Sequence, residues 1–160
     1  PGMAKKSEPK LPSFSYKVFT PAAKADEGHD ENISREKLAA LVGQKTADEL
    51  EAMTLRLYRF AADYLGSRGL ILADTKFEFG LHEGRLILID ELLTPDSSRV
   101  WRALTYKPGA SPASFDKQYV RDSLERSHWN KSHPVPELPA EVAEGTARRY
   151  REYLKIITTP

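Results

Sequence analysis

The stretch Leu70 to Asp90 reads Leu-Ile-Leu-Ala-Asp-Thr-Lys-Phe-Glu-Phe-Gly-Leu-His-Glu-Gly-Arg-Leu-Ile-Leu-Ile-Asp, and the predicted fold is built around it. From Asp74 onward charged and uncharged residues alternate, which is typical of a β-strand because successive side chains point to opposite faces. A polar stretch with glycine then indicates a turn, so the sequence predicts an antiparallel hairpin. Asp74, Lys76 and Glu78 would share one face. Three ionisable groups in a row are costly to bury unless they pair or hold a ligand.

The length of the turn decides which second carboxylate joins Glu78. A three-residue turn over residues 82–84 places Asp90 on the charged face, and this is the register that we prefer. A two-residue turn over residues 83–84 shifts the pairing by one residue and places Glu91 there instead. In either register two carboxylates converge, which suits a magnesium ion bridged to phosphates. The alternative is a solvated sheet face on which lysine and aspartate pair across the strands.

Composition limits the function. The chain has 160 residues, 24 basic and 23 acidic side chains, and a formal net charge of +1. A chain of this length can bury a core of its own, and its near-neutral charge gives no reason to expect nucleic-acid or membrane binding. The absence of cysteine excludes thiol catalysis, cysteine-ligated zinc and a disulfide framework. No apolar run is long enough to span a bilayer, so we expect a cytoplasmic protein.

The remaining pattern predicts helices packed on an antiparallel sheet. Residues 1–18 are polar and punctuated by prolines, which is typical of a linker or arm, so the domain is expected over residues 19–160. Thr46 opens a capping box at the start of a long amphipathic helix that extends to about residue 68. Further helices are expected over residues 35–42, 115–124 and 140–157. The fold class is therefore α+β, with a mainly antiparallel sheet and packed helices. The apolar face of the sheet is expected to carry Phe77, Phe79, Ile87 and Ile89.

The loop after the hairpin combines residue types that bind anions. It reads Thr-Pro-Asp-Ser-Ser-Arg over residues 94–99. The hydroxyls of Ser97 and Ser98 and the guanidinium of Arg99 could together grip a phosphate group. The alternative is a surface ion pair between Asp96 and Arg99.

Other charged residues are weaker candidates. A loop without helical or strand period carries Lys24 and Asp30, and such loops often carry function, although a solvated connector is the alternative. Lys117 and Arg121 form a basic pair four residues apart on a predicted helix, where ordinary helix surface is the alternative. Three arginines within residues 148–151 make a basic patch that is expected to be a solvated face.

Four stretches together resemble the family of SAICAR synthetases, the phosphoribosylaminoimidazole-succinocarboxamide synthases of purine biosynthesis. The first is Phe-Thr-Pro-Ala-Ala-Lys-Ala-Asp-Glu-Gly-His-Asp-Glu-Asn-Ile-Ser over residues 19–34. The second is Ala-Asp-Thr-Lys-Phe-Glu-Phe-Gly over residues 73–80, followed by Asp90-Glu91. The others are Thr-Pro-Asp-Ser-Ser-Arg over residues 94–99, with Trp101, and Ser-Phe-Asp-Lys-Gln-Tyr-Val-Arg over residues 114–121. Their order and spacing suit the family across essentially the whole chain.

The resemblance implies a reaction and a role for each candidate residue. Members of this family use ATP to join L-aspartate to carboxyaminoimidazole ribotide (CAIR), giving the succinocarboxamide, ADP and phosphate. Glu78 and Asp90 would position magnesium and the nucleotide phosphates, and Lys76 would face the reacting carboxylate and phosphoryl group. Nucleotide or substrate contacts are implied for Lys24, Asp30, Asp74, Ser97, Ser98, Arg99, Lys117 and Arg121.

The resemblance also implies a domain organisation. Family members resemble two-lobed proteins, and residues 19–160 are expected to form the C-terminal, ATP-binding lobe. The N-terminal lobe would be the partner of this chain, a homo-oligomer is a further expected arrangement, and the chain alone is expected to be inactive. Two other functions stay open: an ATP-dependent kinase of a small phosphorylated metabolite, and a non-catalytic nucleotide-binding or assembly module.

Overall fold

The computed structural model describes residues 18–23, 30–110, 112–115, 117–130 and 132–159. It divides the chain into two compact units, each of which is described by itself. The β3–β6 unit is described over residues 61–76 and 91–159, and the β4–β5 unit over residues 18–60 and 77–90. Within these described ranges no helix is long and apolar enough to cross a membrane.

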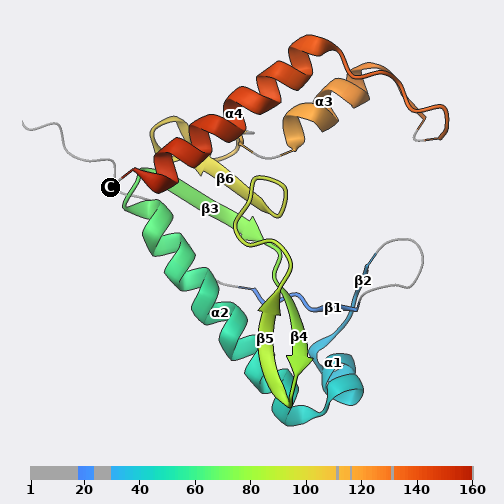
Figure 1. Cartoon of the computed structure of the whole chain (residues 1–160), viewed down its shortest axis with the longest axis vertical. Coiled ribbons are helices and arrows are strands. Elements are labelled where there is room, and N and C mark those ends of the chain that lie inside the picture. Colours follow the sequence, from blue (N-terminus) through green and yellow to red (C-terminus); the bar gives the residue numbers. More distant parts are fainter. Residues whose placement is uncertain (1–17, 24–29, 111, 116, 131, 160) are drawn as a thin grey trace, which may run out of the picture. The chain divides into compact units, whose positions relative to one another are not determined.

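The core of the β3–β6 unit is an antiparallel ribbon of two strands. Strand β3 (Leu70–Thr75) pairs with β6 (Ser98–Arg102), and Figure 1 shows them side by side. The first three residues of β3 are buried, as is Val100 opposite them, because apolar side chains on this short run leave water. Beyond Thr75 the ladder continues through the Lys76 amide, which donates to the carbonyl of Ser97 at 2.9 Å.

A β-bulge interrupts this ribbon at Ala73. Leu72 lies opposite Val100, but the next pair joins Asp74 to Arg99, so one extra residue is accommodated on β3. The bulge shifts the alternation of side chains, and Asp74 therefore leaves the buried face of Leu72 and is exposed.

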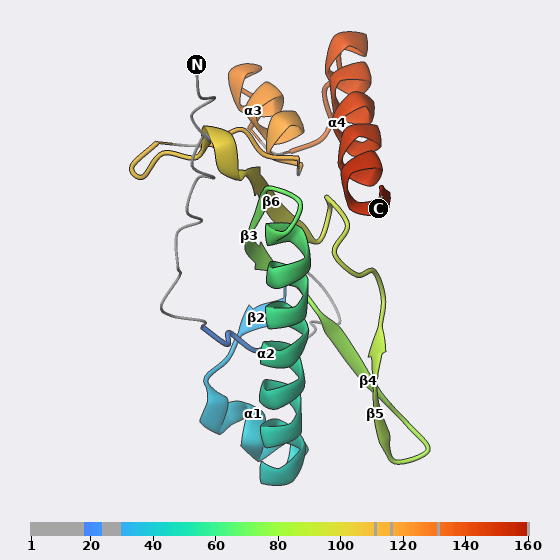
Figure 2. The ribbon, with the colours of Figure 1, turned by 90° about the vertical axis from the view of Figure 1, so that its left-hand side faces the viewer.

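Helices α3 (Gln118–Arg126) and α4 (Ala140–Thr158) complete this unit, together with a 3₁₀ turn at Ala103–Thr105. Figure 2 shows α3 and α4 side by side. Tyr153 of α4 is buried against Phe115, with ring centroids 5.7 Å apart. The predicted helix over residues 115–124 is wrong at its start, because the Phe115 amide donates to the carbonyl of Val100 (3.2 Å) and so belongs to the edge of β6.

The β4–β5 unit contains a separate hairpin. Strand β4 (Glu78–His82) pairs with β5 (Arg85–Ile89) across a two-residue turn in which Glu83 and Gly84 have φ values of 50° and 72°. Two successive left-handed residues match the right-handed twist of the flanking strands. The preferred three-residue turn is therefore wrong, and the two-residue alternative is confirmed.

This register changes the faces of the hairpin. Glu78 lies opposite Ile89, and Phe79 lies opposite Leu88. Ile87 and Ile89 thus share the face of Glu78 and not that of Phe79, so the predicted apolar face is wrong. The predicted charged face is also wrong, because β3 ends at Thr75 and β4 starts anew at Glu78 in a different sheet.

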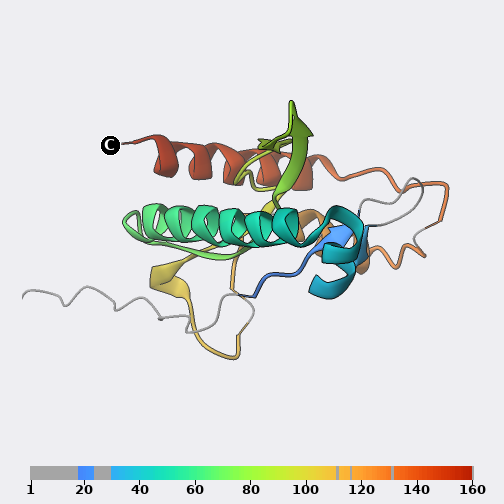
Figure 3. The same cartoon turned by 90° about the horizontal axis from the view of Figure 1, so that it is seen from below.

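The rest of this unit is a short ribbon and two helices. Strand β1 (Ala22–Ala23) pairs with β2 (Glu31–Asn32), and Figure 3 shows α1 (Arg35–Val42) beside the first turns of α2 (Gln44–Gly66). Ser34 caps α1 as predicted, with its Oγ accepting from the Lys37 amide at 3.1 Å. Arg35 then ties the helices together, because its guanidinium donates to Glu51 at 2.7 Å and also to Asp48.

Helix α2 starts earlier than its capping box predicted. The Ala47 amide donates to the carbonyl of Gly43 (3.0 Å), so Thr46 already lies inside the helix. The α+β class with antiparallel pairing is confirmed. The described strands form three two-stranded sheets, however, and not the one larger sheet that the pattern suggested.

Gly145 permits the close contact of α4 with α3. A Cβ atom at this position would lie 2.7 Å from Cε1 of Tyr119, and the guanidinium of Arg149 covers the ring of Tyr119 at 3.8 Å. We expect Gly145→Ala to destabilise the chain by about 1–3 kcal/mol, because the tyrosine ring must be displaced. Urea denaturation measures this loss.

The Tyr119→Ala background is the control for this prediction. Once the ring is absent, Gly145→Ala should be neutral or stabilising, since alanine is the better helix former by up to about 1 kcal/mol. Equal destabilisation in both backgrounds would show that the tyrosine contact is not the cause.

Candidate functional site

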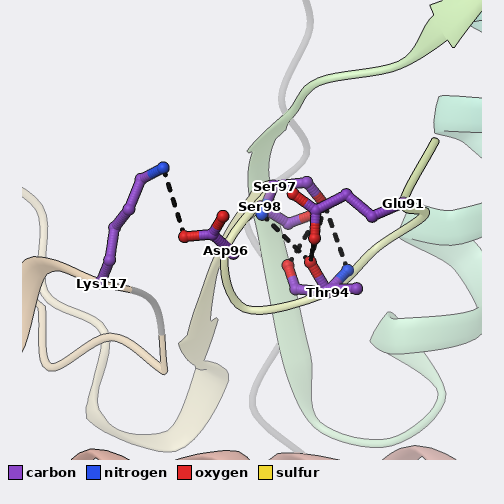
Figure 4. Close-up of polar contacts among 6 residues, drawn as sticks. All are labelled: Glu91, Thr94, Asp96, Ser97, Ser98 and Lys117. Carbon is purple, nitrogen blue, oxygen red and sulfur yellow. Dashed lines mark hydrogen bonds and ion pairs between the residues drawn. The ribbon is translucent and has the colours of Figure 1, made fainter.

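The loop between β5 and β6 is held by its own hydroxyl groups. Figure 4 shows Thr94, Ser97 and Ser98 clustered at the start of β6. The Ser97 amide donates to Oγ1 of Thr94 and the Thr94 amide donates to Oγ of Ser97, both at 3.2 Å. The Thr94 hydroxyl also donates to the carboxylate of Glu91. This reciprocal pattern fixes the backbone of residues 94–97, as expected for threonine and serine in turns.

Ser98 joins this loop to the ribbon. Its side chain is 3% exposed, and its hydroxyl lies 2.8 Å from that of Thr75 on β3 and 3.3 Å from that of Ser97. A buried hydroxyl must keep its hydrogen-bond partners, because losing them leaves an unsatisfied polar group. Ser98 therefore supports the loop, and Ser97 is the less buried of the two predicted serines.

Arg99 is held in a fixed orientation by Asp74. Its Nε donates to both carboxylate oxygens of Asp74, at 2.9 and 3.1 Å, and its Nη2 donates to one of them. The guanidinium lowers the pKa of the Asp74 carboxyl by hydrogen bonding, against a smaller opposing effect of desolvation. The alternative pairing of Arg99 with Asp96 is wrong, because the bulge places Asp74 opposite Arg99.

Asp96 pairs with Lys117 instead. The Nζ of Lys117 lies 3.4 Å from Oδ1 of Asp96, as Figure 4 shows, so the residue before α3 contacts the loop. Both side chains remain partly exposed, at 43% and 58%, and the pair is therefore available for exchange with a bound anion. Arg121, one turn further along α3, is exposed and stays a weaker candidate.

Tyr153 supports the same loop from α4. Its hydroxyl donates to the carbonyl of Leu93 at 2.9 Å, and burial raises the pKa of the phenol. Leu93 has a φ of 55°, so this bond fixes a residue in a left-handed conformation. Sequence patterns gave no sign of this contact, because 60 residues separate its two partners.

Glu78 and Asp90 lie at the same end of the β4–β5 hairpin. Glu78 is paired with Ile89, the residue directly before Asp90. Asp90 has a φ of 63°, and this left-handed turn ends β5. Strand alternation therefore does not determine on which face of the hairpin Asp90 lies. The left-handed backbone of residue 90 determines it instead. Asp90 is exposed and Glu78 is half-buried.

The donors at this end of the hairpin suit a hard cation. Magnesium is commonly held by one or two carboxylates while phosphate and water oxygens fill its other positions. The described residues contain no group of three or more histidine, cysteine, aspartate or glutamate side chains placed for a metal ion. In the described part of the chain, a magnesium ion at Glu78 and Asp90 would therefore need phosphate or water oxygens in its other positions.

The remaining predicted residues are Lys76, Asp30 and Lys24. Lys76 is exposed in the β3–β6 unit, and its amide is fixed by Ser97 at 2.9 Å. Asp30 precedes β2 and is exposed, whereas Lys24 lies outside the described residues. The polar residues that sequence analysis missed are Thr75, Thr94 and Tyr153, together with Glu91 in its role as partner of Thr94.

Known proteins are similar to this chain in sequence. The family model of SAICAR synthetase matches residues 5–136. A phosphoribosylaminoimidazole-succinocarboxamide synthase of Neisseria meningitidis serogroup B is 55% identical over 143 residues, which is 88% of this chain and 50% of the relative. The chain thus spans about half the length of the curated relatives that it matches.

Solved structures share the fold. A SAICAR synthase of Saccharomyces cerevisiae complexed with SAICAR matches with a TM-score of 0.72 and 41% identity, covering 81% of this chain and 44% of that one. A SAICAR synthetase in complex with ADP matches with a TM-score of 0.63 and 28% identity, covering 86% of this chain and 48% of that one.

The Asp74–Arg99 pair predicts a pH-dependent contribution to stability. A carboxyl whose pKa is lowered in the folded state stabilises the fold above its ordinary pKa, and this stabilisation is lost as the pH falls through the lowered value. We expect Asp74→Asn to cost less than about 1 kcal/mol at pH 7, because solvent screens a pair that is more than half exposed. The difference from the parent chain should shrink in urea titrations at decreasing pH. Asp63→Asn, an exposed residue with no described ion pair, is the control, and a deficit for Asp74→Asn that is independent of pH would contradict the prediction.

Proposed function

Because the chain belongs to the SAICAR synthetase family, we propose that it forms part of a ligase that uses ATP to join L-aspartate to CAIR. The observation that carries this proposal is the family match over residues 5–136, which includes the hairpin and the loop at residues 94–99. The fold shared with proteins solved in complex with SAICAR and with ADP supports the same assignment.

The chemistry of amide formation sets the requirements for the site. A carboxylate does not react with an amine until its oxygen becomes a leaving group. ATP therefore transfers its γ-phosphoryl group to the CAIR carboxylate, which yields ADP and an acyl phosphate. The amine of L-aspartate then attacks the acyl carbon, phosphate leaves, and the amine gives up a proton. Negative charge must be neutralised in the first step, and the reactants must be held in line.

Glu78 and Asp90 are proposed to hold the magnesium ion that accompanies the nucleotide. The ion would neutralise phosphate charge during phosphoryl transfer. The hairpin brings both residues to one end, since Asp90 directly follows the strand partner of Glu78. Glu91 is a poorer candidate, because its carboxylate already accepts a hydrogen bond from the hydroxyl of Thr94.

Lys76 and Arg99 are proposed to contact the reacting groups and the ribotide. Lys76 is exposed, its backbone is fixed by Ser97, and an ammonium group suits a developing phosphoryl charge. Arg99 is a bidentate donor that Asp74 holds in place, so its orientation is set before an anion arrives. Ser97 provides a hydroxyl beside it, whereas Ser98 supports the loop from within.

The remaining candidates are proposed to contact the nucleotide or the substrates. Asp30 directly precedes β2, and Lys24 lies outside the described residues; both are charged partners of the kind that the amine and carboxylates of L-aspartate need. Lys117 reaches the 94–99 loop through Asp96, and Arg121 follows it by one turn. Residues 19–160 are proposed to act as the C-terminal lobe of a two-lobed enzyme, in which the other lobe provides the remaining phosphate contacts.

The magnesium assignment predicts the effect of two substitutions. In an enzyme of full family length, Glu78→Gln and Asp90→Asn should each lower magnesium-dependent ATP turnover by roughly 100-fold, because each removes a preorganised charge at the phosphoryl group. Asparagine also tolerates the left-handed backbone of residue 90, so the second change isolates the charge. ADP release is the measurement.

Glu91→Gln is the matched control for both substitutions. It removes an adjacent carboxylate that serves the loop, and turnover should fall by less than about tenfold. Near-normal rates for Glu78→Gln and Asp90→Asn would reject the assignment. A severe loss for Glu91→Gln alone would move the metal ligand to residue 91.

The chain spans about half the length of its curated relatives, and we therefore expect it to be inactive on its own. The 160-residue chain alone should release no measurable ADP when supplied with ATP, magnesium, L-aspartate and CAIR. Carboxylates that water reaches attract a cation by only about 1 kcal/mol per charge, and loose positioning forfeits much of the roughly 7–11 kcal/mol that orientation can supply. Turnover within tenfold of an intact family enzyme, assayed in parallel, would show that the chain contains the whole site.

A further inference from the structure

A basic pocket lies in the β3–β6 unit between β6, the segment before α3, and α4. It has a volume of about 810 Å³. Its charged lining residues are Arg102, Arg148, Arg149, Arg151, Lys155 and Glu152. Among the described residues of the lining, five cations thus face one carboxylate in a protein whose formal net charge is only +1. Such a concentration of one sign attracts anions to this surface.

The α4 part of the pocket is an ordered row. Counted from Arg148, the other members lie three, four and seven residues further along the chain, so all of them share one face of the helix. They are Arg151, Glu152 and Lys155. At 1.5 Å per residue, this row is about 10 Å long. It is therefore longer than a single phosphate group needs, yet too short for the wide basic field of a nucleic-acid site.

Two of the five cations are anchored by the protein itself. The guanidinium of Arg102 donates to Glu152 and lies 5.2 Å from the ring centre of Phe115. Arg149 donates to the carbonyl of Gly145 at 3.2 Å and covers the ring of Tyr119. Anchored guanidinium groups lose little freedom when an anion binds, which favours binding.

The other three cations are available to a ligand. Arg148, Arg151 and Lys155 are exposed, and none of them forms an ion pair with a carboxylate in the described part of the chain. Arg151 and Lys155 stand four residues apart with like charges, an arrangement that opposes helix stability unless an anion lies between them. Arginine in particular offers bidentate donors that match phosphate oxygens.

We propose that this pocket binds a linear polyphosphate, either as an inorganic chain or as the phosphate part of a nucleoside triphosphate. The length of the row and the excess of positive charge suit several linked phosphates. Phe115, the only aromatic residue among the described residues of the lining, is 4% exposed, so its ring face is not open for a base to stack on. Recognition therefore rests on the phosphates, and the inorganic and nucleotide forms should bind alike.

The test is calorimetric titration of the 160-residue chain with inorganic tripolyphosphate in magnesium-free buffer at an ionic strength of about 0.1 M, which screens charges more than about 10 Å away. Omitting magnesium removes any binding that depends on Glu78 and Asp90. The parent chain should bind one equivalent saturably, and Arg148→Gln/Arg151→Gln should weaken binding by at least about tenfold. No saturable binding by the parent chain would overturn the proposal.

Arg56→Gln/Arg59→Gln is the matched control. These two exposed arginines are also three residues apart on a helix, α2, and lie outside the pocket. The control should stay within about twofold of the parent, since these two arginines do not line the pocket. An equal loss in both double variants would show attraction by overall charge and would overturn the proposal.

Glu152→Gln provides a second variant that should gain affinity. It removes the only carboxylate among the described residues of the lining and with it the repulsion of phosphate oxygens, while the ring of Phe115 still holds Arg102, so binding should tighten by about threefold or more. Unchanged or weaker binding would contradict the site. ATP titrated in the same way should match tripolyphosphate within about threefold, whereas far tighter binding of ATP would show that a base is recognised and would overturn recognition by phosphates alone.

Discussion

The antiparallel ladder between β3 and β6 is the constraint on which the candidate site depends. It places Asp74 opposite Arg99 and Thr75 opposite Ser98, and it fixes the Lys76 amide on Ser97. Backbone hydrogen bonds, and not the charged side chains, therefore determine which polar groups meet. The side-chain contacts then stiffen a geometry that buried aliphatic residues at the start of β3 already hold in place.

Features with local causes could be predicted from the sequence. Ser34 caps α1 because its side chain and the Lys37 amide are three residues apart, and such a contact depends on few neighbours. Helix α4 keeps its predicted bounds to within a residue, because its apolar stripe and the preceding prolines act at short range. The 94–99 loop is likewise recognisable from its hydroxyl residues, which bond to one another.

Features that depend on distant partners could not be predicted. The bulge at Ala73 reverses the alternation before Asp74, and a period-two pattern contains no signal for one added residue. The turn at Glu83 and Gly84 was ambiguous by one position, which was enough to exchange the faces of Ile87 and Ile89. The bond from Tyr153 to Leu93 depends on the packing of α4, which only the folded chain reveals.

The left-handed conformation of Leu93 has opposite effects on backbone strain and on backbone order. A leucine at a φ of 55° is strained by roughly 1–2 kcal/mol, which glycine would relieve. Glycine would also widen the conformations open to the backbone that presents the Tyr153 acceptor and leads into Thr94. Glycine at position 93 would therefore exchange the relief of strain for a less ordered backbone at the start of the loop, so the change in stability is the difference between these two effects.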